Sequence, residues 1–168
     1  LKISKLEYMK VTLDTVLYSN TSDRIILQSC MQNWFRNPKD LQFTDPRMSY
    51  PFDFRKWCSL SYKEKNTKTF VIKKDKWIIG YISLKTVPEK KQAHLFHLFV
   101  DKEYRQLGLA RMLIDHVVKL SKDLHLNYIT LNVTSKNERA IIIYKAAGFE
   151  ENGITSSGSV KMKKLVDQ

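Results

Sequence analysis

The fold of this chain is decided by the stretch Val100-Asp-Lys-Glu-Tyr-Arg-Gln-Leu-Gly-Leu-Ala110, which joins two contrasting patterns. An apolar run over 93–100 precedes it, and a helical pattern over 109–120 follows it. A strand, a tight turn and a helix start in this order form a phosphate cradle, because the first helical amides have no intrahelical partner. The helix dipole adds partial positive charge at the same place. We therefore expect the turn to bind a pyrophosphate or a similar group.

The spacing Arg105-x-x-Gly108-x-Ala110 distinguishes this turn from two other phosphate-binding motifs. A Walker loop requires Gly-Lys-Ser/Thr and the dinucleotide fingerprint requires Gly-x-Gly-x-x-Gly, and the stretch has neither. It resembles the acetyl-CoA motif (Arg/Gln)-x-x-Gly-x-(Gly/Ala) of the GNAT acetyltransferase superfamily. On this motif alone, an ordinary turn between a strand and a helix is the alternative.

A second stretch, Asn137-Glu-Arg-Ala-Ile-Ile-Ile-Tyr-Lys-Ala-Ala-Gly-Phe149, resembles the superfamily's other signature, Asn-x-x-Ala-x-x-x-Tyr-x-x-x-Gly-Phe. Its pattern is helical, and Ser135 with Glu138 predicts a capping box. Gly148 stands where a helix often ends on a left-handed residue. Because the two motifs occur in the superfamily's order and distance, the resemblance is specific over residues 93–150. It is loose over the part of the chain before them.

Length and composition set broad limits on the protein. The chain has 168 residues, of which 43% are hydrophobic, and this predicts one globular domain over 1–168. No apolar run approaches the roughly 18 residues of a membrane span, and no signal peptide is evident. Cys30 and Cys58 are isolated, which favours a reducing cytoplasm.

The formal net charge of +12 indicates an anionic partner, and acetyl-CoA with its phosphates is one such partner. The lysines are scattered, so compositional bias explains the charge as well. A nucleic-acid-binding module is therefore a weaker alternative, and nucleic acid is an unlikely partner. The positive balance also argues against a polycationic substrate, which would be repelled.

Hydrophobic periodicity predicts alternating strands and helices. The expected strands are 4–11, 67–73, 77–85, 93–100, 127–133, 150–155 and 159–165. The expected helices are one capped by Thr21-Ser22-Asp23 and stopped at Asn37-Pro38, a short one over 54–60, and two over 109–122 and 137–147. An irregular, aromatic-rich loop is expected over 37–53, either lining an apolar acceptor pocket or packing into the core.

The unit over 93–133 is expected to be parallel and right-handed, and the hairpins before it antiparallel. The resemblance implies the same arrangement, an α+β GNAT fold. Its central twisted sheet would be mostly antiparallel, with about seven strands and about four flanking helices. The fourth and fifth strands would form a parallel, splayed pair.

The resemblance places acetyl-CoA in the wedge between the fourth and fifth strands. The fourth strand's backbone would bond the pantetheine arm, and the turn amides would receive the pyrophosphate. The implied cofactor residues are Leu98, Phe99, Val100, Arg105, Gln106, Leu107, Gly108, Leu109, Ala110, Asn137 and Tyr144. For Arg105 the alternative is a solvated loop charge, and for Asn137 it is hydrogen bonding at the helix start.

Tyr144 matches the superfamily's general acid. When an amine attacks the thioester, CoA leaves as a thiolate. A phenol with a pKa of about 10 can protonate or hydrogen-bond a thiolate whose parent pKa is about 8.5. The alternative is a tyrosine that only packs in the core.

The candidate general bases are His94 and His97, because the strand over 93–100 has no carboxylate. His94 matches a position that holds an acidic residue or a histidine in several members, and we expect it to be the base. Their spacing puts the two on opposite faces unless the strand bulges, so at most one is expected to face the cleft. Two histidines without further ligands do not make a metal site. Asn132 stands where N-terminal-alanine acetyltransferases carry a Glu, which weakens a substrate of that kind.

The sequence therefore predicts an acetyltransferase that moves the acetyl group of acetyl-CoA to a primary amine of a small molecule or peptide, by direct attack in a ternary complex. The alternative from another class is a non-catalytic acyl-CoA-binding domain. The expected cosubstrate is acetyl-CoA with no metal. The expected state is a cytoplasmic monomer or homodimer that does not bind membranes.

Overall fold

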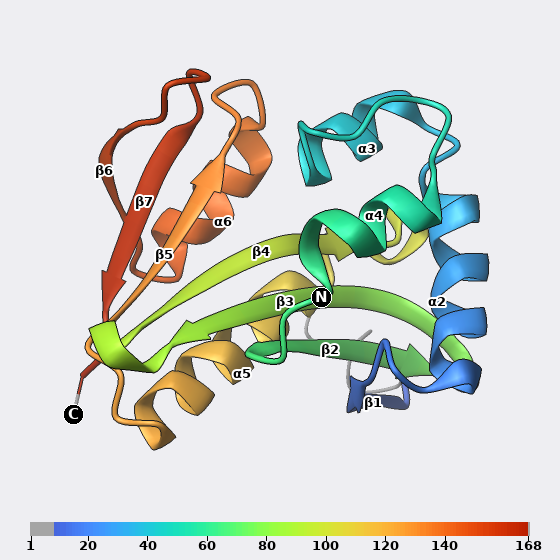
Figure 1. Cartoon of the computed structure of the whole chain (residues 1–168), viewed down its shortest axis with the longest axis horizontal. Coiled ribbons are helices and arrows are strands. Elements are labelled where there is room, and N and C mark those ends of the chain that lie inside the picture. The colour runs from blue at the N-terminus through green and yellow to red at the C-terminus, as the bar shows by residue number, and fades with distance from the viewer. Residues whose placement is uncertain (1–8, 168) are drawn as a thin grey trace.

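The computed structural model describes residues 9–167, in which helices cover both faces of a seven-stranded sheet (Figure 1). The strands are β1 (Val11–Val16), β2 (Thr67–Lys74), β3 (Trp77–Val87), β4 (Gln92–Val100), β5 (Tyr128–Val133), β6 (Glu150–Ile154) and β7 (Val160–Leu165). The helices are α2 (Thr21–Trp34), α3 (Pro38–Thr44), α4 (Phe54–Ser61), α5 (Leu109–Asp123) and α6 (Glu138–Ala146), with 3-10 turns η1 (Pro88–Lys90) and η2 (Lys102–Tyr104).

The sheet has the strand order β1-β2-β3-β4-β5-β7-β6. Every neighbouring pair is antiparallel except β4 and β5, which run parallel because α5 crosses between them. The predicted mostly antiparallel sheet with one parallel pair is thereby confirmed. The parallel pairing covers only three residue pairs, from Gln92 with Tyr128 to His94 with Thr130. Beyond His94 the two strands separate, as Figure 1 shows.

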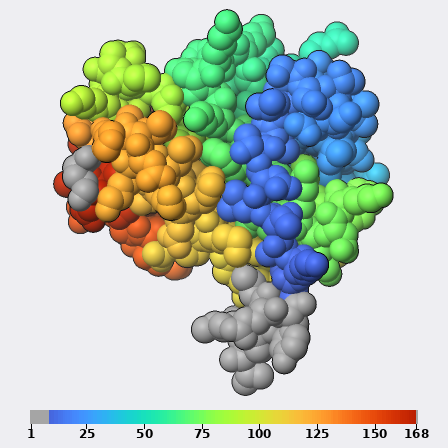
Figure 2. Space-filling view, turned by 90° about the horizontal axis from the view of Figure 1, so that it is seen from below, coloured from blue at the N-terminus to red at the C-terminus, as the bar shows by residue number. Residues whose placement is uncertain are grey.

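Two apolar clusters hold the layers together. One lies between the sheet and α5 with α6, and includes Leu113, Val117, Ile129 and Phe149. The other lies between the opposite face and the helices α2 to α4, and is rich in aromatic rings. Figure 2 shows the molecule from below, where β1, α2 and α5 contribute to the surface. Among residues 9–167, none of the helices combines the length and the hydropathy that a membrane span requires.

The N-terminal half differs from the sequence-based expectations. Part of the strand expected over 4–11 lies outside the described residues, and the first described strand is β1, which starts at Val11. The expected irregular loop over 37–53 contains α3, so the described residues hold five α-helices rather than about four. Asn37 caps α3 by accepting from the amides of Lys39 and Asp40, and Pro38 fills its first position.

Two helix starts also differ from the sequence-based interpretation. Asn20, not the segment from Thr21, caps α2 through a hydrogen bond from the Asp23 amide. The predicted capping box of Ser135 and Glu138 is wrong, because Asn137 is the cap and accepts from the Ala140 amide. A carboxamide oxygen satisfies the free amides of the first turn as well as a serine would.

Candidate active site

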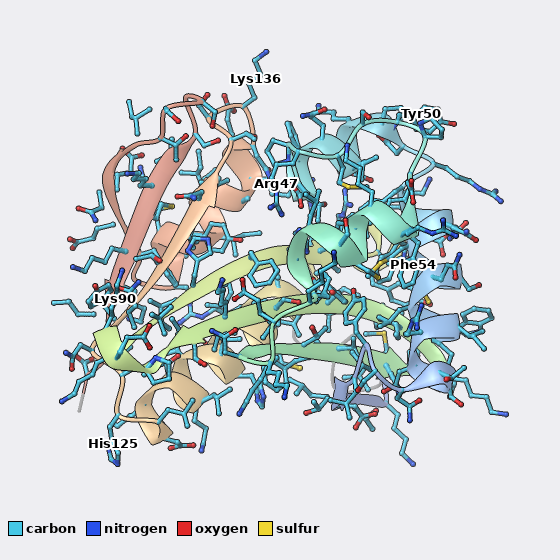
Figure 3. All side chains as sticks on the ribbon, viewed as in Figure 1. Arg47, Tyr50, Phe54, Lys90, His125 and Lys136 are labelled. Atoms are coloured by element: carbon cyan, nitrogen blue, oxygen red, sulfur yellow. The ribbon has the colours of Figure 1, made fainter. Side chains whose placement is uncertain are left out.

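The separation of β4 from β5 opens a cleft of about 580 Å³. Its walls come from β4 and β5, from α6, from the β6–β7 turn, and from the segment that joins α3 to α4. The polar and titratable side chains in the wall include Asp45, Arg47, Ser61, Lys63, Glu64, Lys85, His94, His97, Asn132, Asn137 and Tyr144. Figure 3 shows Arg47 reaching from the α3–α4 segment toward the space that faces α6.

A bulge in β4 turns both strand histidines to the same face of the sheet. Tyr81 of β3 pairs with Phe99 and Ser83 pairs with Phe96, so β4 carries one residue more than its partner. His97 has a positive φ of 55°, which interrupts the alternation of side chains. The expectation that at most one histidine faces the cleft is therefore wrong, since both contribute to its wall.

His94 lies at the last paired position before β4 and β5 separate. Its Nδ1 lies 2.9 Å from Thr130 Oγ1, which is in turn 3.5 Å from the carbonyl oxygen of Ala93. If the threonine hydroxyl points to that carbonyl, His94 Nδ1–H donates to Thr130 and Nε2 is the basic nitrogen. Among the described residues Nε2 has no partner. Burial, with a contribution from Lys85, lowers the pKa of His94 below its ordinary value, which favours the neutral ring.

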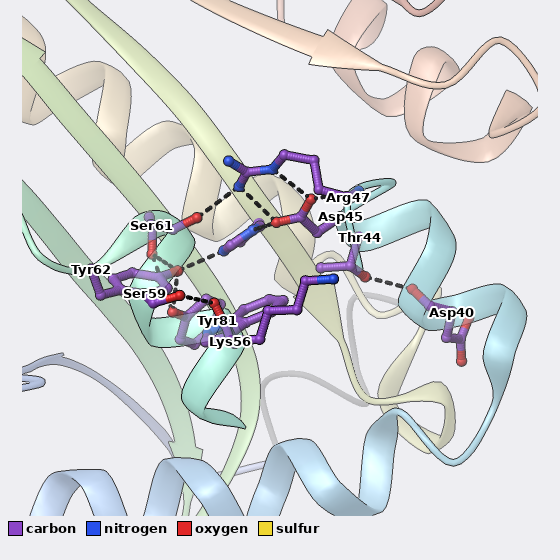
Figure 4. A network of polar contacts seen from close by, with 12 residues as sticks. Asp40, Thr44, Asp45, Arg47, Lys56, Ser59, Ser61, Tyr62 and Tyr81 are labelled. Atoms are coloured by element: carbon purple, nitrogen blue, oxygen red, sulfur yellow. Dashed lines mark hydrogen bonds and ion pairs between the residues drawn. The ribbon is translucent and has the colours of Figure 1, made fainter. Parts of the chain in front are cut away.

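His97 belongs to a buried network that joins the end of α4 to the α3–α4 segment, and Figure 4 shows Tyr62, Asp45 and Arg47 of this network. Its Nε2 is 2.7 Å from Asp45 Oδ2, and its Nδ1 is 2.7 Å from the Tyr62 hydroxyl. Tyr62 also accepts from Tyr81, and its ring lies beside that of His97. Only 5% of His97 is exposed.

The network gives one arrangement of protons on His97 when each hydroxyl donates along it, with Ser83 as a side branch that bonds Tyr62 and Tyr81. It begins at the indole N–H of Trp57, a donor only, and continues through the hydroxyls of Tyr18, Tyr81 and Tyr62. It ends at Asp45, which as a carboxylate can only accept. If each hydroxyl donates once along this chain, Tyr62 donates to Nδ1 of His97 and Nε2–H donates to Asp45. His97 is then a neutral ring with both nitrogens engaged.

Electrostatics agree with a neutral His97 beside an ionised Asp45. Burial lowers the pKa of His97, and this outweighs the opposite influence of Asp45. Burial also acts to raise the pKa of Asp45, but hydrogen bonds from His97 and Arg47 hold it well below its usual range. Asp45, Arg47 and Tyr62 were missed from the sequence as site residues.

Tyr144 and Asn137 lie on the α6 side of the cleft, as their spacing on one helix requires. Tyr144 is buried with its ring against Phe149, and its hydroxyl has no hydrogen-bond partner among the described residues. Burial raises its pKa above the ordinary value, so the phenol stays protonated. Gly148 ends α6 with a φ of 93°, as predicted.

The turn over 105–110 follows the end of β4. Gln106 and Gly108 have positive φ values of 62° and 86°, and a Cβ added to Gly108 would meet no atom within 4 Å. The space beside Gly108 is therefore open, and a ligand can approach the backbone amides at the start of α5. Arg105 instead turns inward: its Nε donates to the carbonyl of Val100, and its Nη2 is 3.3 Å from Asp40 Oδ2.

The structure thus divides the predicted site residues into two groups. His94, His97, Leu98, Asn137 and Tyr144 meet in the wall of the cleft. The other predicted cofactor residues, Phe99, Val100 and those over 105–110, lie outside that wall, at and beyond the C-terminal end of β4. Residues 9–167 hold no group of three or more His, Cys, Asp or Glu side chains placed to bind a metal ion.

Comparison with known proteins gives a family match over much of the chain. Residues 29–149 match the model described as the acetyltransferase (GNAT) family. Human N-acetyltransferase 8 is 27% identical over 94 residues, which are 54% of this chain and 41% of that protein. The peptidyl-lysine N-acetyltransferase YjaB of Escherichia coli is 35% identical over 60 residues, 36% of this chain and 37% of that one. The matches therefore span about two fifths of these relatives.

Solved structures share the fold over nearly the whole chain. Spermidine N-acetyltransferase from Vibrio cholerae, solved in complex with CoA and spermine, superposes with a TM-score of 0.72 and 20% identity. The superposition covers 93% of this chain and 95% of that one. At this identity, the likeness shows the fold alone.

Proposed function

Because the chain belongs to the acetyltransferase (GNAT) family, we propose that it transfers the acetyl group of acetyl-CoA to a primary amine in the cleft between β4 and β5. The observation that carries the proposal is the separation of these strands beyond His94, with His94 and Tyr144 both in the cleft wall. The reaction then needs no covalent enzyme intermediate, because amine and thioester meet directly.

The residues present fit acetyl-CoA. Among residues 9–167, the backbone of β4 beyond His94 has no strand partner on the side toward β5, so Leu98, Phe99 and Val100 can bond an extended pantetheine arm. The amides from Gln106 to Ala110, at the start of a 15-residue helix, suit a pyrophosphate. Gly108 leaves room for its approach. Acetyl-CoA supplies an acetyl group that is already activated as a thioester.

Arg105 supports the turn rather than the phosphates in this account. Its guanidinium is tied to Val100 and Asp40, and it lies 5.2 Å from the centre of the Phe99 ring. These contacts fix the end of β4 relative to the turn and to α3. We assign it a positioning role.

We assign the general base to His94. An ammonium group must lose a proton before its nitrogen can attack, and the base must be neutral at working pH to take it. The lowered pKa and unpartnered Nε2 of His94 meet both requirements. His97 does not, because Tyr62 and Asp45 engage both of its nitrogens. We assign His97 a positioning role, because its contacts hold β4, α4 and the α3–α4 segment in fixed positions relative to one another.

We assign the proton donor to Tyr144. Its hydroxyl is protonated, has no partner among the described residues, and belongs to the α6 wall of the cleft. A donor in that state can stabilise the negative charge that develops on the departing sulfur. Asn137 caps α6, and its Oδ1 accepts a hydrogen bond from the Ala140 amide. This bond fixes the orientation of the Asn137 side chain in the same wall.

The test is release of the CoA thiol from acetyl-CoA in the presence of a broad panel of amines. Amine-dependent release with N-acetylated product supports the proposal. Tight CoA binding without transfer to any amine would support the alternative, a non-catalytic acyl-CoA-binding domain.

A further inference from the structure

Arg47 is fixed in the cleft wall in a way that leaves part of its guanidinium free. Its Nε donates to Asp45 Oδ1 at 3.0 Å, and its Nη2 donates to Asp45 Oδ2 and to Ser61 Oγ, both at 2.8 Å (Figure 4). A guanidinium has five N–H groups, and these bonds use three of them. The two on Nη1 have no partner among the described residues. The side chain is 54% exposed, so this edge is accessible.

Asp45 is itself held by His97 and buried at 3% exposure, so the pair is rigid. A buried carboxylate that grips one edge of an arginine presents the other edge in a fixed direction. Little side-chain entropy is then lost when a ligand binds to that edge.

The charges in the cleft wall favour an anion over a second cation. The two acidic residues in the wall are both engaged, Asp45 by Arg47 and Glu64 by Lys85 at 2.6 Å. The basic residues are Arg47, Lys63 and Lys85, so cations outnumber carboxylates. Glu64 is 61% exposed and its Oε1 has no partner among the described residues, so one carboxylate oxygen stays accessible, but the three cations against two carboxylates leave the wall positive.

We propose that the amine acceptor carries an anionic group, a carboxylate or a phosphate, that binds to the free Nη1 edge of Arg47. The proposal rests on the proposed function, because it names the substrate class of the same cleft. An amino acid is the simplest acceptor of this kind, with the amine directed to His94 and the anion to Arg47. A polyamine offers Arg47 only repulsion.

The experiment compares charge-matched acceptor pairs with acetyl-CoA as donor. An amino acid is tested against its carboxamide, and aminoethyl phosphate against ethanolamine. The carboxamide has the less basic amine, so at neutral pH a larger fraction of it is free base, and this acts against the amino acid; Arg47→Gln then separates any remaining difference in amine reactivity from binding of the anion. We expect the anionic member of at least one pair to have a kcat/KM roughly 10- to 100-fold higher, the range of a charged hydrogen bond. The pair in which the anionic member is preferred shows whether the site binds a carboxylate or a phosphate.

Arg47→Gln should remove this preference through the KM of the anionic acceptor. The measured quantity is the ratio of kcat/KM between the two members of a pair, because a loss of stability or of common rate from removing a partner of the buried Asp45 cancels in that ratio. Arg47→Lys keeps the positive charge but not the planar guanidinium that makes paired hydrogen bonds, so it should retain part of the preference. The control is Arg55→Gln, an exposed arginine on α4 outside the cleft wall. Equal losses for neutral and anionic acceptors, which would leave the ratio within each pair unchanged, would overturn the proposal.

Failure of the proposed function is recognised separately. If no amine in the panel is acetylated, binding of an N-acetylated amino acid to the CoA complex is measured by saturation-transfer NMR. Binding that Arg47→Gln abolishes and Arg55→Gln preserves supports the anion site without turnover. Absence of binding to the wild-type protein contradicts the anion site.

Discussion

Nε2 of His97 lies 2.7 Å from Oδ2 of Asp45, and this contact joins β4 to the segment between α3 and α4. The two residues are 52 positions apart in the sequence. Both are buried, and the ring of His97 stacks on Trp57 of α4 with centroids 3.8 Å apart. One wall of the cleft is therefore attached to the sheet through a polar contact inside an aromatic cluster.

Asp45→Asn should destabilise the protein by about 2 kcal/mol or more, because it removes a buried charge that His97 and Arg47 both engage. Urea unfolding measures the change. Asp75→Asn is the matched control, since Asp75 is exposed at the β2–β3 turn and asparagine tolerates its φ of 56°. Equal stability of the two variants would show that the Asp45 contacts contribute little.

The stability of the protein should fall as the pH falls below about 6.5, in part because of His97. The pKa of His97 is lowered in the folded protein, so the unfolded chain takes up a proton that the folded one does not. Above about pH 6.5 both states are neutral at this residue, and the difference disappears. His97→Gln should reduce the loss of Tm between about pH 7.5 and pH 5.5. His94 and His116 are common to both proteins, so their contributions cancel in the comparison. An unchanged pH dependence would contradict the lowered pKa.

Gly108→Glu should weaken CoA binding by more than about tenfold, or about 1.4 kcal/mol, because it adds a negative charge beside the proposed pyrophosphate site. Calorimetry with CoA measures the affinity. Gly153→Glu is the control for strain, because Gly153 is an exposed glycine outside the cleft wall with a positive φ of 120°. Similar affinities of the two folded variants would remove the phosphate assignment of the turn.

The local elements of the fold could be predicted because their signals are local. The strands and helices from residue 67 onward follow hydrophobic periodicity, and Gly148 ends α6 as its position indicates. The missed helix α3 also had a local signal, since Asn37 and Pro38 form a typical helix start followed by an acidic residue. The same dipeptide also predicts the end of the preceding helix, and that signal alone leads to the expected loop over 37–53.

The candidate site was predictable only where it lies within the two motifs. The shared face of His94 and His97 depends on a bulge, and no residue type in β4 requires a positive φ at position 97. The partnership of His97 with Asp45 depends on the packing of α3 and α4 against the sheet. Periodicity along the chain carries no information about such long-range contacts.

The pH–rate profile should identify His94 as the base. Because the pKa of His94 is lowered, kcat/KM should rise with pH through a value below about 6.5 and be level near neutrality, apart from the titration of the amine itself. The profile of His94→Gln should lack this limb, and its kcat should be about 100-fold lower than that of the wild type. His97→Gln, if folded, should keep the limb. A limb that disappears with His97 and not with His94 would reverse the assignment.

Tyr144→Phe provides the most direct test of acetyl transfer in this cleft. The substitution removes only a hydroxyl that has no partner among the described residues, so Tm and CoA affinity should change little. The measurement is the rate at which labelled acetyl passes from acetyl-CoA to the nitrogen of an acceptor amine, with Tyr104→Phe as the control tyrosine outside the cleft wall. We expect transfer by the wild type and a kcat roughly 100-fold lower for Tyr144→Phe. Normal kcat with an early melting transition would contradict it, because Tyr144 would then be a core residue without a part in the reaction.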